Sequence, residues 1–320
     1  MLVLAGSPQL TRAADGHAAT PRIVAYVISA LKMGDLANAR ALVNQYRKLN
    51  GDTPEALEAF SWLARGEVAA GNSDAAQADA TEIEQLAKTA LSTRPLDAEP
   101  HLPLALGAAY EVQADLLKKQ NQRTEALQLL RAAIVTWRGT SLVDRLQKNI
   151  NLLTLQGKPM PLLQQADWIG AKPAAAHPER GKPTLLFFWA HWCPDCKAEA
   201  PIMRALAEEF GPRGLVILAP TRYYGYTAQE ENATPAVEKS FMEKVFERYY
   251  SQIPGILVPV DSGNFTRFGV STTPTIVLAD RRGTVRLYHP GAMDQESLAK
   301  AIEQVLAPAG AAPKSAGAGR

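Results

Sequence analysis

The stretch that decides the fold is Trp192-Cys193-Pro194-Asp195-Cys196, which lies between an apolar run and a helical pattern. The preceding run, Pro183-Thr184-Leu185-Leu186-Phe187-Phe188-Trp189-Ala190, is continuous and rich in residues that favour strands, which predicts a buried strand. After the second cysteine, Met203, Leu206 and Phe210 recur at helical spacing. The pentapeptide is therefore expected to form a strand-to-helix turn.

The two cysteines of this turn differ in their expected environments. Pro194 suits the first position of a helix, which places Cys193 at or beside the N-cap. There the unpaired N–H groups and the positive end of the helix dipole favour a thiolate over a thiol. Cys196 follows on the same face about one turn later, close enough to attack a mixed disulfide held on Cys193. These are the only cysteines in 320 residues, and the order strand, CxxC, helix predicts dithiol–disulfide exchange.

A CxxC pair can also hold half of a zinc site or form an inert disulfide staple. Zinc needs four ligands, and the chain has no second CxxC and no pair of its five His residues at HxxxH spacing. We therefore expect no metal and no cofactor. A staple that closes so short a loop constrains little of the unfolded chain, so it is disfavoured too.

Length and charge limit the remaining possibilities. A chain of 320 residues predicts about two domains. With 34 Lys and Arg against 32 Asp and Glu, the net charge of +2 argues against a nucleic-acid partner. No run of apolar residues is long enough to span a membrane. The start, Met1-Leu2-Val3-Leu4-Ala5, resembles the tail of a secretory leader without its basic segment, so residues 1–19 are expected to be a leader remnant or disordered. The first alternative places the protein outside the cytoplasm and the second leaves it cytoplasmic.

Residues 20–156 are predicted to form a helical domain. Apolar residues recur there at helical spacing in seven stripes: Ile23–Leu31, Leu36–Tyr46, Leu57–Ala64, Ile83–Leu91, Leu102–Leu117, Leu127–Trp137 and Leu142–Leu153. Trp62-Leu63-Ala64-Arg65-Gly66 and Leu106-Gly107-Ala108-Ala109-Tyr110 are similar to pieces of the tetratricopeptide consensus, although the intervals between turns are irregular. The resemblance implies helical hairpins that bind a partner on a concave face. A domain that only packs or dimerises is the alternative.

Residues 157–306 are predicted to form an α/β domain, because strand and helix patterns alternate there. Strands are expected over 214–219 and 256–260, and a hairpin over 275–288. Helices are expected after the CxxC pair, through Val237 to Phe246, over Asn264 to Phe268 and through Leu298 to Leu306. Segment 157–180 is expected to be a linker leading into this domain, and 307–320 a disordered tail.

The second domain resembles the thioredoxin fold, with a central mixed sheet flanked by helices. The resemblance rests on the strand ending in Phe188-Trp189-Ala190, the WCxxC turn, the mid-helix Pro201 and the stretch Val270-Ser271-Thr272-Thr273-Pro274-Thr275 before the hairpin. It covers residues 157–306.

The resemblance implies a client-binding site beside the dithiol. Pro274 would be a cis proline facing the CxxC pair, and Thr273 before it would pair its backbone with an extended client segment. Trp192, Pro194 and Asp195 would line the same site. A trans proline at the start of an edge strand is the alternative for Pro274.

Within this superfamily the chain resembles the extracytoplasmic TlpA/ResA-like reductases. The insert at 221–255, the opening Gly157-Lys158-Pro159-Met160-Pro161 and the CxxCxxE pattern ending at Glu199 are typical of that group. Thioredoxin has a buried Asp where Phe187 stands here. Glu199 would take the proton from Cys196 during resolution and, when ionised, would raise the thiol pKa values. An exposed acid on the helix surface is the alternative.

His191 precedes the first cysteine by two residues. As a cation it would stabilise the thiolate and make the protein more oxidising. The favoured interpretation is a solvated loop histidine.

The sequence therefore predicts a thiol–disulfide oxidoreductase in which Cys193 attacks and Cys196 resolves. The expected partners are a disulfide-bearing client protein and an upstream thiol donor. The resemblance to the TlpA/ResA-like reductases implies that the client is reduced outside the cytoplasm. The net direction of exchange depends on the redox poise of both partners. A helical scaffold or redox sensor with little turnover is the alternative. A thiol peroxidase is less favoured, because it expects Thr where Ala190 stands.

Overall fold

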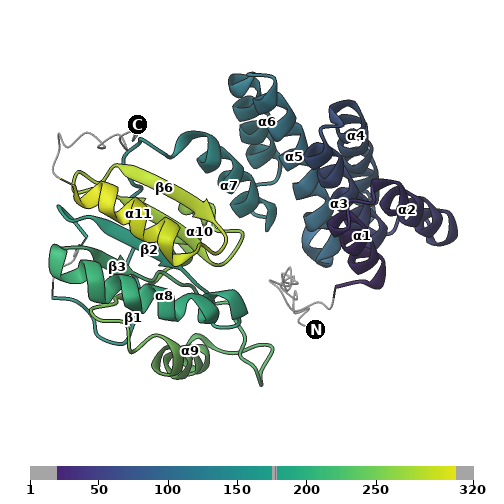
Figure 1. Ribbon diagram of the computed structural model, residues 1–320. Coiled ribbons are helices and arrows are strands. Elements are labelled where there is room, and N and C mark those ends of the chain that lie inside the picture. Colours follow the sequence, from purple (N-terminus) through teal and green to yellow (C-terminus); the bar gives the residue numbers. More distant parts are fainter. Residues whose placement is uncertain (1–19, 175–176, 178, 308–320) are drawn as a thin grey trace, which may run out of the picture. The chain divides into compact units, whose positions relative to one another are not determined.

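The computed structural model describes residues 20–174, 177 and 179–307 (Figure 1). The chain divides into two compact units, with the border between Ile150 and Asn151. The predicted border, between residues 156 and 157, falls within the second of these units. The predicted leader remnant and residues 308–320 of the predicted tail lie outside the described residues. No helix in the described part of the chain is long and apolar enough to cross a bilayer.

The first unit is helical, as predicted. Its helices are α1 (Arg22–Lys32), α2 (Leu36–Asn50), α3 (Pro54–Ala70), α4 (Ser73–Ala90), α5 (His101–Lys119), α6 (Arg123–Thr136) and α7 (Leu142–Thr154), with a 3-10 turn at Leu96–Ala98. Helix α7 runs past the border into the second unit. The helices α1, α3 and α5 are successive neighbours, and α2, α4 and α6 each pack on the helix before them. This arrangement is compatible with successive helical hairpins, and the tetratricopeptide-like repeat remains a prediction.

Local sequence signals set the ends of these helices. Thr53 caps α3, because its side chain accepts the N–H of Ala56, and Pro54 occupies the first turn. The same helix ends at Gly71, which has a left-handed conformation (φ 83°) that glycine adopts without a steric cost. The apolar stripe of each helix then becomes its buried face, as for Val24, Val27 and Ala30 in α1.

The second unit is built on a mixed four-stranded sheet of order β3-β2-β5-β6. The strands are β2 (Thr184–Phe188), β3 (Val216–Leu218), β5 (Thr275–Ala279) and β6 (Val285–Pro290). Strand β2 is parallel to β3 and antiparallel to β5, which pairs antiparallel with β6 in the predicted hairpin. All five residues of β2 are buried, as the continuous apolar run predicts for a central strand.

Helices and a two-stranded ribbon complete this unit. The helices are α8 (Pro194–Phe210), α9 (Pro235–Tyr249), α10 (Ser262–Phe268) and α11 (Gln295–Leu306), with a 3-10 turn at Gly211–Arg213. Helix α11 packs against α8 and the β5–β6 hairpin. Strand β1 (Asp167–Ile169) pairs with β4 (Val258–Val260). Two isolated bridges, Leu218 with Leu257 and Thr221 with Val260, connect the end of β3 and the residues after it to the β4 segment.

The prediction of a linker over 157–180 is wrong between Leu163 and Ile169. Strand β1 lies in this segment, and Leu163, Trp168 and Ile169 are buried. The backbone N–H of Gln164 donates to the Asn264 side chain, which donates in return to the Gln164 carbonyl. The Pro and Gly residues obscured a short apolar signal that only pairing with β4 makes into a strand.

Candidate active site

The two cysteines lie at the turn between β2 and α8. Cys193 is the N-cap of α8, Pro194 occupies the first turn, and the two cysteines form a disulfide. The backbone N–H of Cys196 donates to Cys193 Sγ at 3.0 Å, which is the role that an N-cap oxygen has in other helices. The helix N-terminus therefore provides a hydrogen bond and a favourable dipole to the sulfur of Cys193.

Thr273 and Pro274 face this turn, because β2 and β5 are paired. Their register sets Phe188 at the end of β2 opposite Thr275 at the start of β5. The Thr273–Pro274 peptide bond is cis, so the alternative of a trans proline is wrong. The carbonyl oxygen of Thr273 lies 3.4 Å from Cys193 Sγ. The two segments that the sequence singled out therefore meet at one sulfur.

Burial does not distinguish the two sulfurs. Cys193 is 1% exposed and Cys196 is 0% exposed. Pro194 and Asp195 between them are exposed, and Trp192 is half-buried with its ring 5.7 Å from that of Tyr224. Identifying the attacking cysteine therefore depends on the helix N-cap rather than on access.

Glu199 lies buried on the face of α8 that carries Cys196, three residues further along. It is 4% exposed, so the alternative of a surface acid is wrong. Its Oε1 accepts the N–H of Met293 at 2.6 Å, and its buried Oε2 has no hydrogen-bond partner in the structure. Burial raises the pKa of Glu199 to about 7, the Met293 N–H opposes this shift, and the charge of Asp195 adds to it. A carboxyl in this state exchanges a proton near neutral pH.

These features agree with a family match. A model described as "Thioredoxin-like domain" matches residues 173–306. This segment is a thioredoxin-like domain. The match covers the disulfide, Glu199 and the Thr273–Pro274 turn, and the mixed sheet with flanking helices confirms the predicted fold class.

Curated relatives of this chain carry names from thiol chemistry. The chain is 29% identical to "Thiol-disulfide oxidoreductase ResA" of Geobacillus thermodenitrificans over 126 residues, which is 39% of this chain and 64% of the relative. It is 29% identical to "Thiol:disulfide interchange protein DsbE" of Pseudomonas fluorescens over 140 residues, 43% of this chain and 68% of the relative. It is 26% identical to "Thioredoxin-like protein YneN" of Bacillus subtilis over 124 residues, 39% of this chain and 65% of the relative. The chain thus spans just under two thirds of the length of these ResA and YneN relatives.

His191 of the thioredoxin-like domain is buried, at 2% exposed, so the interpretation as a solvated loop histidine is wrong. Its Nε2 lies 3.3 Å from Oε1 of Glu238, without a hydrogen bond between the two atoms. Its ring also meets Tyr224, Tyr226 and Phe241 edge to face. The insert, through its first loop and α9, therefore encloses the residue that leads into the Trp192–Cys193 turn.

Within the insert, Glu238 ties the start of α9 to the loop that precedes it. It is fully buried, and its two oxygens accept the backbone N–H groups of Tyr224 at 2.5 Å and Gly225 at 2.6 Å. Sequence reasoning missed this residue. A Glu in the first turn of a helix, after the N-cap Thr234, is an ordinary feature of a helix start.

We expect Glu238→Ala to destabilise the protein by roughly 2–5 kcal/mol, because it leaves two backbone N–H groups of the insert without an acceptor. The free energy of unfolding from urea titration measures this effect. The control is Glu243→Ala, an exposed Glu on the same helix, which is expected to change stability by less than about 0.5 kcal/mol. Equal losses in the two variants would contradict the assigned role of Glu238.

Proposed function

We propose that this protein is a thiol–disulfide oxidoreductase that reduces disulfides of client proteins outside the cytoplasm. The observation that carries the proposal is the position of Cys193 Sγ, which accepts the N–H of Cys196 and lies 3.4 Å from the Thr273 carbonyl. That position combines stabilisation of a thiolate with a backbone against which an extended client segment can lie.

The reaction starts from the reduced dithiol. The Cys193 thiolate attacks one client sulfur, the client disulfide breaks, and the departing client thiolate takes up a proton. The Cys196 thiolate then attacks Cys193 Sγ, which breaks the mixed disulfide and releases the second client thiolate. Two electrons pass to the client, and the disulfide between Cys193 and Cys196 is the oxidised product. An upstream dithiol restores the reduced state in the same two steps reversed.

Glu199 accepts the proton of Cys196 in the second step. Its buried position one turn beyond Cys196 and its pKa of about 7 suit this role. The unpartnered Oε2 is the oxygen that takes the proton, since Oε1 is bonded to the Met293 N–H.

The surroundings of the dithiol receive the client. Trp192, Pro194 and Asp195 form one side of the client site, and the Thr273–Pro274 turn forms the other. The names of the ResA and DsbE relatives support disulfide exchange as the reaction. The family resemblance supports reduction outside the cytoplasm. The helical unit serves partner binding or dimerisation.

The test is catalysis of insulin-disulfide reduction by dithiothreitol. The wild type is expected to accelerate the reaction, and the double variant Cys193→Ala/Cys196→Ala is expected to leave the rate of dithiothreitol alone. A wild type that does not exceed the double variant would favour the scaffold or sensor alternative.

A further inference from the structure

The helical unit carries an apolar groove between α1 and α3 that the thiol chemistry does not use. Its volume is about 480 Å³. The wall contains Ile28 and Leu31 of α1, Leu36 at the start of α2, and Trp62 and Gly66 of α3. Pockets of this size and character accommodate one or two bulky apolar side chains.

Gly66 keeps the two leucine side chains against the α3 backbone. A Cβ atom at this position would lie 2.5 Å from Leu31 Cδ2 and 3.2 Å from Leu36 Cδ2. Both side chains would have to move. The absence of a side chain at 66 therefore fixes the shape of the groove wall.

The rim of the groove is cationic. Lys32 and Arg65 both line it, and the Arg65 guanidinium lies over the Trp62 ring at 4.9 Å. Trp62 is half-buried, so the stacked pair presents an apolar ring and a charge at one place. An apolar ligand with a negative group beside it fits both features.

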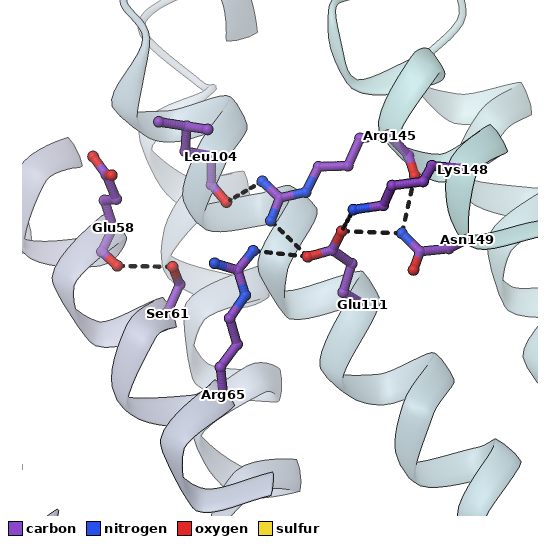
Figure 2. A network of polar contacts seen from close by, with 8 residues as sticks. All are labelled: Glu58, Ser61, Arg65, Leu104, Glu111, Arg145, Lys148 and Asn149. Carbon is purple, nitrogen blue, oxygen red and sulfur yellow. Dashed lines mark hydrogen bonds and ion pairs between the residues drawn. The ribbon is translucent and has the colours of Figure 1, made fainter. Parts of the chain in front are cut away.

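Arg65 also joins the groove to a cluster of charges on α5 and α7. Figure 2 shows Arg65 and Arg145 reaching one oxygen of Glu111 from two sides, while Lys148 reaches the other oxygen. The distances from Glu111 Oε2 are 2.7 Å to Arg65 and 2.6 Å to Arg145. Three cations thus surround one carboxylate, and the apolar Leu104 nearby is 44% exposed.

Arg65 keeps donors for a second anion. The hydrogen bond of Arg65 uses only Nη2, which leaves Nη1 and Nε. Its side chain is 30% exposed, so an incoming carboxylate can reach it. A ligand carboxylate here would bind beside Glu111 without displacing it.

We propose that the groove and the adjoining Glu111 cluster bind a peptide segment of a partner protein in which an apolar side chain is followed closely by acidic residues. The apolar side chain enters the groove, and the carboxylates meet Lys32 and Arg65. This inference deepens the partner-binding role proposed above for the helical unit and rests on that role. The excess of positive charge selects against segments in which basic residues follow the apolar one.

The test uses fluorescein-labelled hexapeptide pools and fluorescence anisotropy. The first pool has Leu, Ile or Phe followed by Asp or Glu, the second has the same apolar residues followed by Lys or Arg, and the third has Ser followed by Asp or Glu. The full chain is expected to bind the first pool about tenfold or more tightly than either of the others. Equal binding of the three pools would overturn the proposal.

Two pairs of variants locate the site. Ala69→Trp fills the groove from an exposed position on α3 and is expected to weaken binding about tenfold, whereas Ala41→Trp, an exposed position on α2 that does not line the groove, has no effect. Lys32→Glu is expected to weaken binding about threefold to tenfold, whereas Lys48→Glu, with the same change of net charge, leaves it unchanged. Equal effects within a pair would overturn the assignment.

The same samples separate this proposal from the redox function. All four variants are expected to reduce insulin at the wild-type rate, because none belongs to the unit that carries the dithiol. Peptide binding without insulin reduction would contradict the oxidoreductase and leave the docking site standing. Insulin reduction without selective peptide binding would contradict the docking site only. Dimerisation in sedimentation that Ala69→Trp abolishes would replace the peptide by a second copy of the chain.

Discussion

Cys193→Ala and Cys196→Ala are each expected to lower catalysed insulin reduction to the rate of dithiothreitol alone. Only Cys196→Ala is expected to accumulate mixed disulfides with client proteins. Cys193 has the N-cap position, where the N–H of Cys196 donates to its sulfur at 3.0 Å. A thiolate is favoured there, and without Cys196 nothing in the chain resolves the adduct that it forms.

Adducts are measured by non-reducing electrophoresis and intact mass after a block with N-ethylmaleimide. The double variant gives the background, since the chain has no other cysteine. Adducts on Cys193→Ala but not on Cys196→Ala would reverse the order of attack. Loss of adducts in both variants would show that exchange does not pass through a covalent client complex.

The central part of the thioredoxin-like domain was predictable because each signal in it is local. The apolar run at 184–188 is long enough to require burial on both faces, and it forms the central strand β2. Pro194 fixes the first turn of α8, and Cys193 therefore has to be the N-cap. The helical unit was predictable for the same reason, since its apolar stripes repeat at helical spacing over whole helices.

The contacts that complete the site were not predictable, because they join distant parts of the chain. The Glu199 carboxylate accepts a hydrogen bond from the Met293 N–H, and His191 lies beside Glu238. The two residues of each pair belong to different segments of the fold. A sequence reports the polarity of such residues but not the cavity around them. His191 was therefore assigned to solvent, although aromatic rings of the insert surround it. Strand β1 was missed for a similar reason, as three residues show no periodicity until β4 pairs with them.

Glu199→Gln is expected to lower the pH of half-maximal alkylation of the reduced dithiol by about one unit. Above pH 7 the wild-type carboxyl is largely ionised, since burial raises its pKa to about 7, and its charge opposes thiolates on the same helix end. The neutral Gln removes this charge. The measurement is a pH series of iodoacetamide alkylation followed by mass spectrometry. Glu209→Gln, an exposed acid on α8, is the control and is expected to shift the curve only slightly.

The same substitution is expected to change how stability depends on pH. The folded state raises the pKa of Glu199 from 4.5 to about 7, so it binds a proton more tightly than the unfolded chain does. The contribution of Glu199 to stability is therefore fully present below about pH 4.5 and is lost as the pH rises through about 7. Between pH 4 and pH 8.5, the free energy of unfolding of Glu199→Gln should therefore rise by up to about 3 kcal/mol relative to that of the wild type.

Urea unfolding of the oxidised proteins at these two pH values measures the gain without involving the thiols. Glu209→Gln is expected to show no such difference, because an exposed side chain has nearly the same surroundings in the folded and in the unfolded chain. The free energies of unfolding of Glu199→Gln and the wild type could instead differ by the same amount at both pH values. That result would mean that Glu199 ionises as readily in the folded protein as in the unfolded chain. It would then have no proton-accepting role near neutral pH. The disulfide exchange itself would survive that result, because it depends on the N-cap position of Cys193 and the Thr273–Pro274 turn.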